Sequence, residues 1–127
     1  MIGGATLFQE DLDRVMQCRM NAKQMNSYRI ELASTGWTVP FEGVRHRTDV
    51  SFGRRLRLVE YSREMPLHWC SRGHFGYVLE GRFEIEFDNE TIVFEPGDGI
   101  CIPDGDEHRH RAGALTDVVR VFFVEEA

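Results

Sequence analysis

The sequence is poor in cysteine, in lysine and in long apolar runs. Three cysteines, Cys18, Cys70 and Cys101, occur among 127 residues, an odd and sparse set that argues against a disulfide framework. No apolar run approaches the roughly 20 residues that a membrane-spanning helix needs. The first residues contain neither a basic region nor an apolar core, so we expect no signal peptide. These absences predict a cytoplasmic protein with no membrane partner.

The charge balance of the chain is acidic. Its formal net charge is −6, from 15 basic and 21 acidic residues, and Lys23 is the one lysine. A general nucleic-acid binder needs a basic surface for its phosphate contacts, so nucleic acid is not an expected partner. An apolar content of 42%, with nine phenylalanines, indicates a globular chain that buries a core without disulfides.

Short strands separated by tight turns dominate the sequence from residue 44 onward. Residues 82–87 alternate strictly, which predicts that Phe83, Ile85 and Phe87 face a core while the acidic residues between them face water. Regular short strands of this kind predict an all-β fold, an antiparallel barrel or sandwich, over residues 44–127. Further strands are predicted at residues 44–52, 56–62, 75–79, 91–94, 100–102 and 118–124.

Residues 1–43 have a different pattern. Apolar residues at helical spacing predict a helix from about residue 8 to 25, and residues 28–32 are compatible with a short strand. Turn residues at 34–36 and Pro40 then interrupt the chain. We interpret residues 1–43 as a helix and arm that pack either on the β-domain or on a dimer partner.

Residues 66–81 concentrate side chains that bind metals. They contain His68, Cys70 and His74 within one short stretch. Side chains two apart on a strand share a face, so His68 and Cys70 can address one point, and the turn at residues 71–73 lets His74 return to it. Imidazole and thiolate are the ligands that borderline and soft divalent metals prefer. The alternative is a surface hairpin with two solvated histidines and a half-buried cysteine.

The order of motifs resembles the cupin family of small double-stranded β-helix, or jelly-roll, barrels. The first cupin motif reads His-x-His, three or four residues, Glu, and six residues to a Gly, and the ending Tyr77-Val78-Leu79-Glu80-Gly81 matches it. The second motif reads Pro-x-Gly-Asp, a short strand, Ile-Pro, four residues and His. Residues 95–98 and 100–103, followed by His108, match it. The resemblance covers about residues 44–124 and implies the cupin jelly-roll fold.

The resemblance also implies a metal site with an altered set of ligands. Counting back from Gly81 places His68 on the first family histidine, Cys70 on the second and His74 on the glutamate, while the second motif contributes His108. The expected metal ligands are therefore His68, Cys70, His74 and His108. Both replacements are themselves metal ligands, which argues against a degenerate site. His110 is either a substitute ligand, a group that orients a ligand, or a polar residue of the barrel lining.

This ligand set limits the metal. A thiolate disfavours Mn, Mg and Ca, whereas imidazoles with a thiolate favour Zn or Fe and are compatible with Ni or Cu. Four bound ligands would close a tetrahedral zinc site, and one free ligand would leave a position for water, oxygen or a chelating substrate.

Small cupins include oxygenases, isomerases, epimerases and decarboxylases. The resemblance therefore implies a metal-dependent enzyme that acts on a small polar metabolite, with His110 or Tyr61 as a candidate proton carrier. The alternative is a non-catalytic barrel that binds a small molecule or a metal and reports it to a partner. The family habit, together with the unassigned N-terminal segment, implies a homodimer.

Several other residues carry simpler expectations. We expect Cys101 to be a small core residue between two isoleucines and His46 to lie on the surface of its strand. The candidates for the mouth of a pocket are Arg57, Tyr61, Tyr77 and Trp69.

Overall fold

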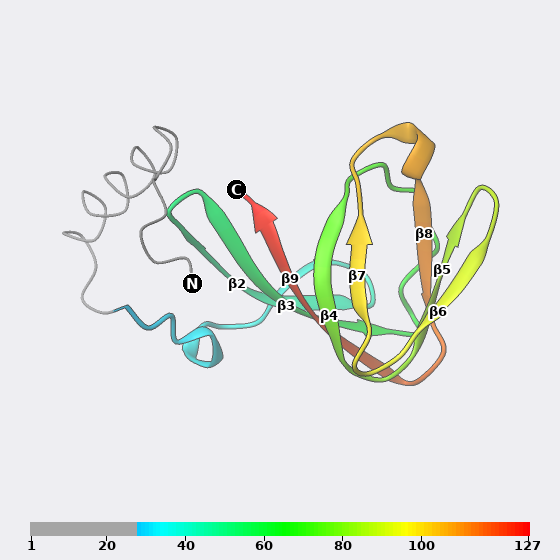
Figure 1. The fold of residues 1–127 in the computed structure, drawn as a ribbon. Coiled ribbons are helices and arrows are strands. Elements are labelled where there is room, and N and C mark those ends of the chain that lie inside the picture. The colour runs from blue at the N-terminus through cyan, green and yellow to red at the C-terminus, as the bar shows by residue number, and fades with distance from the viewer. Residues whose placement is uncertain (1–27) are drawn as a thin grey trace, which may run out of the picture. The chain divides into compact units, whose positions relative to one another are not determined.

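The computed structural model describes residues 28–127, and these are mostly β-strand (Figure 1). Among these residues no helix is long and apolar enough to cross a membrane. The helix predicted near residues 8–25 lies outside the described residues. The elements are η1 (Leu32–Ser34), β1 (Thr38–Phe41), β2 (Val44–Ser51), β3 (Arg54–Ser62), β4 (His74–Glu80), β5 (Phe83–Phe87), β6 (Thr91–Phe94), β7 (Gly99–Ile102), η2 (Asp106–His108), β8 (His110–Ala114) and β9 (Val118–Glu126).

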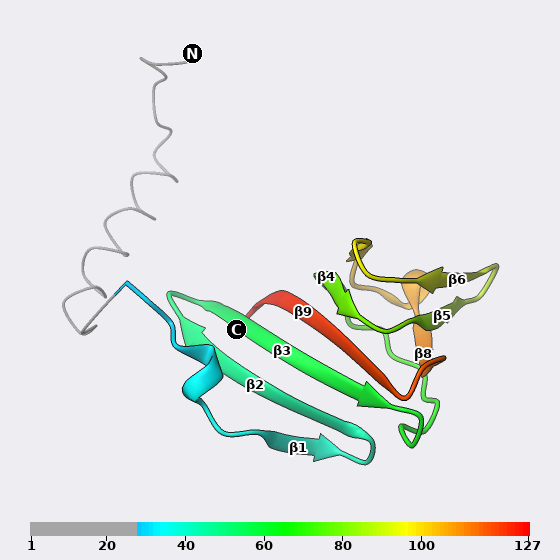
Figure 2. The same ribbon diagram turned by 90° about the horizontal axis from the view of Figure 1, so that it is seen from below.

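The strands form two antiparallel sheets. The larger sheet has six strands in the order β1-β2-β3-β9-β4-β7, and the smaller has three in the order β6-β5-β8. Strand β9, at the end of the chain, lies beside β3 (Figure 2). The two strands pair from Arg54↔Glu126 to Ser62↔Val118. Because β9 also pairs with β4, the C-terminal strand joins the early and middle parts of the chain into one sheet. The predicted all-β, jelly-roll architecture is confirmed.

The core lies between the two sheets. Val59, Val78 and Val121 from the large sheet are completely buried, and they belong to one apolar cluster with Phe83 and Ile85 from the small sheet. The inward face predicted for residues 82–87 is therefore confirmed. The expectation that Cys101 is a core residue is wrong. Cys101 is exposed, because side chains alternate along the strand and its neighbours Ile100 and Ile102 point inward.

The N-terminal edge of the sheet differs from the prediction. Residues 28–32 do not form a strand; the chain instead makes the short turn η1, which Thr35 closes by donating from its backbone N–H and its hydroxyl to the carbonyl of Leu32. Strand β1 then adds to the sheet ahead of residue 44, because Gly43, at φ +76°, permits a tight reversal that pairs Phe41 with Val44.

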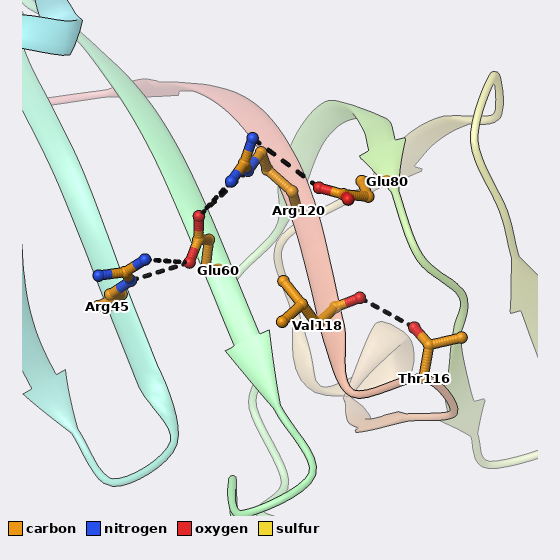
Figure 3. A network of polar contacts seen from close by, with 6 residues as sticks. All are labelled: Arg45, Glu60, Glu80, Thr116, Val118 and Arg120. Atoms are coloured by element: carbon orange, nitrogen blue, oxygen red, sulfur yellow. Dashed lines mark hydrogen bonds and ion pairs between the residues drawn. The ribbon is translucent and has the colours of Figure 1, made fainter.

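A polar network ties four strands together on the outer face of the large sheet (Figure 3). Glu60 of β3 is only 7% exposed and accepts hydrogen bonds from Arg45 of β2 and Arg120 of β9. Arg120 also lies 3.8 Å from the carboxylate of Glu80 on β4. Burial alone would raise the pKa of Glu60, but the hydrogen bonds from both arginines hold that pKa below its usual value. The network links four strands whose opposite face contributes to the site described next.

Candidate metal centre

A cavity of about 570 Å³ lies between the two sheets. Its walls come from all six strands of the large sheet, from β5 and β8 of the small one and from the segment between β3 and β4. Apolar side chains such as Phe83, Ile100 and Phe123 form much of the lining, and polar side chains are set among them. A volume of this size suits a small organic ligand.

Three potential metal ligands meet at the wall of this cavity. The ligand atoms of Cys70, His74 and His110 all lie within 4.8 Å of one another. Cys70 and His110 form an isolated antiparallel bridge, with hydrogen bonds of 2.8 and 2.9 Å between their backbones, so their side chains share one face. His74 is the first residue of β4, and its ring lies 5.2 Å from the ring of His110.

Burial holds the imidazole of His74 in the neutral form that binds metals. Burial, with smaller contributions from His110 and Arg57, lowers the pKa of His74 to about 4. The Nδ1 of His74 is buried without a hydrogen-bond partner among the described residues. The Nδ1 of His110 lies 3.1 Å from the carbonyl of His108. Because a carbonyl only accepts, this Nδ1 carries the hydrogen, which leaves Nε2 as the atom of His110 that can bind a metal.

Cys70 is placed for the same task. The backbone N–H of Arg72 donates a hydrogen bond to its sulfur at 3.4 Å. Two ligand atoms bound to one tetrahedral zinc at about 2.0–2.3 Å are roughly 3.3–3.8 Å apart. The observed limit of 4.8 Å therefore requires only small side-chain movements for all three atoms to reach one ion. The donor set and its geometry fit a divalent metal.

The structure brings together two of the four predicted ligands, Cys70 and His74, and adds His110. His68 lines the same cavity but is an exposed residue, and its ring lies edge-on to Phe41 at 5.4 Å. His68 does not belong to the three-residue cluster.

His108, the fourth predicted ligand, lies outside both the cluster and the cavity lining. Its side chain is 42% exposed, with Nε2 3.9 Å from Glu107. His108 and His110 do not lie on one strand face, because His108 ends the 3-10 turn η2 and strand β8 begins only at His110.

Of the other candidate residues, some line the cavity and some do not. Arg57 and Tyr61 line the cavity as expected. His46 lines it as well, which corrects the surface position predicted for it. Tyr77 is instead exposed on the outer face, and the ring of Trp69 lies under the guanidinium groups of Arg109 and Arg111 rather than in the cavity lining. A signal for His46 existed in its alternation with Val44, which is buried.

Tyr61 keeps its proton in this cavity. Burial raises the pKa of Tyr61 to about 12, and the nearby Glu125 and Cys70 act in the same direction, whereas Arg57 opposes them. The phenol is therefore neutral over the physiological range. Its chemistry toward a ligand is to donate a hydrogen bond rather than to transfer a proton, so its expected role as a proton carrier has little support.

The fold and the His/Cys cluster define a small jelly-roll barrel with a metal-compatible cavity. The family model of the Cupin domain matches residues 56–125, which is more than half of the chain. The protein therefore belongs to the cupin family.

Solved structures agree with this assignment of the fold. KdgF from Halomonas sp. is 22% identical, with a TM-score of 0.64, over 80% of this chain and 95% of that protein. The polyketide cyclase RemF from Streptomyces resistomycificus is 23% identical, with a TM-score of 0.62, over 79% of each chain. An Fe(II) form of HppE is 14% identical, with a TM-score of 0.62, over 79% of this chain and 60% of HppE. A search of curated proteins gives no match. At these identities the similarity establishes the fold alone.

Proposed function

We propose that the barrel binds a divalent metal through Cys70, His74 and His110 and acts as a metal-dependent enzyme on a small polar metabolite. The reaction type is that of an oxygenase, isomerase or decarboxylase. The observation that carries the proposal is the convergence of three metal ligands on the wall of a cavity large enough for a substrate. A thiolate with two imidazoles suits Zn or Fe, with Ni or Cu as further options. HppE, which shares the fold, has a solved Fe(II) form.

Three protein ligands leave one coordination position open, as in catalytic zinc sites. A metal bound there supplies a Lewis acid that polarises a substrate oxygen or a bound water. The protein contributes the surroundings: Phe83 and Phe123 exclude water from the cavity wall, and Tyr61 offers a hydrogen bond from its neutral phenol. The hydrogen bond from Nδ1 of His110 to the carbonyl of His108 would hold the ring in place to bind the metal through Nε2.

A second function, a non-catalytic barrel that senses a metal or a small molecule, is favoured by one specific observation. His68 lines the same cavity as the cluster, and its approach would complete a set of four ligands. A closed tetrahedral site of that kind is structural or regulatory rather than catalytic.

Metal analysis followed by a turnover assay separates the two functions. Untagged protein purified without chelator should contain close to one equivalent of Zn or Fe by inductively coupled plasma mass spectrometry. The loaded protein, at a hundredth of the ligand concentration, is then incubated with a library of small polar metabolites, with chelator-treated protein as the control. Loss of one compound in excess of the protein supports an enzyme, stoichiometric binding alone supports the sensor, and protein without metal contradicts both.

We also propose that the protein is a cytoplasmic homodimer. The free thiols of Cys70 and Cys101 are compatible with a reducing compartment. On the outer face of β4, Phe75 is 65% exposed and Tyr77 is 49% exposed, with the exposed Leu79 following them. Adjacent exposed apolar side chains are typical of a surface that another chain covers.

Light scattering tests the dimer. At micromolar concentration the protein should have twice the mass of its chain, and Tyr77→Lys should shift it toward the monomer, because the substitution places a charge in the interface. Val93→Lys, an equally exposed valine on the small sheet, serves as the control and should leave the mass unchanged. A monomer mass for the unaltered protein would contradict the proposal.

A further inference from the structure

The side chains that line the cavity carry an excess of positive charge, although the chain as a whole is acidic. Four arginines line the cavity, Arg55, Arg57, Arg72 and Arg111, against the single carboxylate of Glu125, whereas the whole chain has a net charge of −6. A cavity lined by an excess of one sign of charge concentrates ligands of the opposite sign. The lining therefore favours an anionic ligand.

The partners of these arginines show where that excess lies. Arg57 donates to both carboxylate oxygens of Glu125, at 2.6 and 3.3 Å, and Arg111 donates to Glu86 at 2.9 Å. Within residues 28–127, the guanidinium groups of Arg55 and Arg72 make no hydrogen bond and no ion pair. Arg72 is exposed, whereas Arg55 is half-buried. One unpaired positive charge, that of Arg55, thus remains inside the cavity.

Two further polar groups near Arg55 also lack partners. The Nδ1 of His46 and the Oγ1 of Thr48 are buried, and neither has a hydrogen bond among the described residues. Both side chains line the cavity from β2, where Thr48 lies directly opposite Arg57 and His46 two residues farther along. Besides burial, the charges of Arg57 and Arg55 lower the pKa of His46, so both guanidinium groups lie within electrostatic reach of its ring. Buried polar atoms are nearly always hydrogen-bonded, and a pair without partners beside a free cation indicates the place of a ligand.

We propose that Arg55, Thr48 and His46 form a subsite that binds the carboxylate of a small organic acid. The guanidinium supplies a planar pair of donors and the hydroxyl a further one, which matches the two oxygens of a carboxylate. One uncompensated positive charge balances a monoanionic carboxylate better than a phosphate dianion. Apolar walls such as Phe123, which lies 5.1 Å under the Arg57 guanidinium, then contact the carbon skeleton.

This subsite adjoins the metal cluster. The Nδ1 of His74 lies 4.0 Å from a carboxylate oxygen of Glu125, and the same carboxylate accepts from Arg57, the cross-strand neighbour of Thr48. An acid bound by Arg55 therefore extends toward the metal ligands. The inference rests on the proposed function only for the reaction of the acid at the metal. Binding of the carboxylate by the subsite itself needs no metal.

Binding of benzoate to metal-free protein tests the subsite. After chelator treatment, titration by NMR should show that benzoate binds. Benzamide, its neutral counterpart of the same shape, should bind at least about tenfold more weakly. Arg55→Met should reduce the affinity for benzoate to that for benzamide, and Arg55→Lys should retain part of it. Arg54→Met is the matched control, because Arg54 precedes Arg55 on β3 and is exposed; it should leave the affinity unchanged.

Several outcomes would overturn the inference. Equal affinities for benzoate and benzamide would remove the role of charge, and unchanged affinity in a folded Arg55→Met or Arg55→Lys protein would remove the role of Arg55. Tighter binding of phenyl phosphate than of benzoate would show that the subsite prefers a phosphate to a carboxylate. Metal content, measured separately on the same variants, distinguishes the two proposals: benzoate binding by a protein that takes up no metal would leave the subsite standing and contradict the metal-dependent function.

Discussion

Replacing His110 with alanine should abolish stoichiometric metal binding, whereas replacing His108 with alanine should leave it intact. His110 is 4% exposed and lies across a backbone bridge from Cys70, while the side chain of His108 is 42% exposed and lies outside the cluster. Removing one of three ligands typically lowers metal affinity by orders of magnitude, because the remaining two cannot complete the coordination shell. Metal content of untagged protein, measured by mass spectrometry, provides the comparison.

The two variants are matched, since they remove the same side chain two positions apart. Retention of metal by His110→Ala and its loss from His108→Ala would show that the family's motif spacing, rather than the observed cluster, identifies the ligand. His68→Ala then reports whether the site is open or closed. Unchanged metal content with His68→Ala supports three ligands, whereas a loss equal to that of His110→Ala supports four.

The cysteines provide an independent readout of the same site. With metal bound, the thiolate of Cys70 should resist alkylation by iodoacetamide, and chelation should restore its reactivity. Cys101, which is free and exposed, serves as the internal control and should react equally in both states. Chelation should also lower the melting temperature, because a ligand that binds only the folded state stabilises it. Equal labelling of Cys70 with and without metal would exclude it as a ligand.

The fold is largely predictable because its strands carry a local signal. In residues 82–87 every second side chain is apolar, and the structure buries Phe83 and Ile85 as that period requires. The motif around Cys70 and His74 is also local, and the structure brings these two side chains together. The same local pattern fails for His68, which lies only two residues before Cys70 and yet is outside the cluster.

The choice between His108 and His110 depends on the backbone instead. Gly105, at φ +126°, begins a 3-10 turn that ends at His108, so the strand face starts two residues later than the motif spacing implies. Which histidine faces Cys70 is then decided by a pairing between residues 40 positions apart in the sequence. The sequence Asp104-Gly105-Asp106 signals a turn, but the pairing of Cys70 with His110 has no signature in the local pattern.

His46 was misplaced for a different reason. The inward side of β2 carries His46 and Thr48 after the buried Val44, and polar residues on a strand normally indicate a solvent-facing side. Here the inward side faces a cavity between the sheets rather than a packed core. A polar cavity lining therefore gives nearly the same sequence pattern as an exposed face, apart from the spacing of His46 from the apolar Val44. The position of the second sheet distinguishes the two.

Replacing Val121 with aspartate should unfold or severely destabilise the protein. Val121 is completely buried in β9 and lies between Val59 and Val78, which are also completely buried. An unpaired carboxylate there loses its hydration without gaining a partner, and the free energy of unfolding should fall by several kcal/mol, on the order of 3–5 kcal/mol. Because the strand joins β3 to β4, the loss should appear as one cooperative transition.

Two further variants make the Val121 result interpretable. Val121→Ala, which only removes methyl groups, should cost about 1–3 kcal/mol and gives a measurable value if the aspartate variant does not fold. Val118→Asp, the same substitution at the exposed start of the same strand, should change stability by less than about 1 kcal/mol. Urea denaturation followed by circular dichroism measures all three. If Val121→Asp and Val118→Asp had equal midpoints, β9 would not lie at the centre of the large sheet, and the cavity wall that Phe123 and Glu125 contribute from this strand would lose its basis.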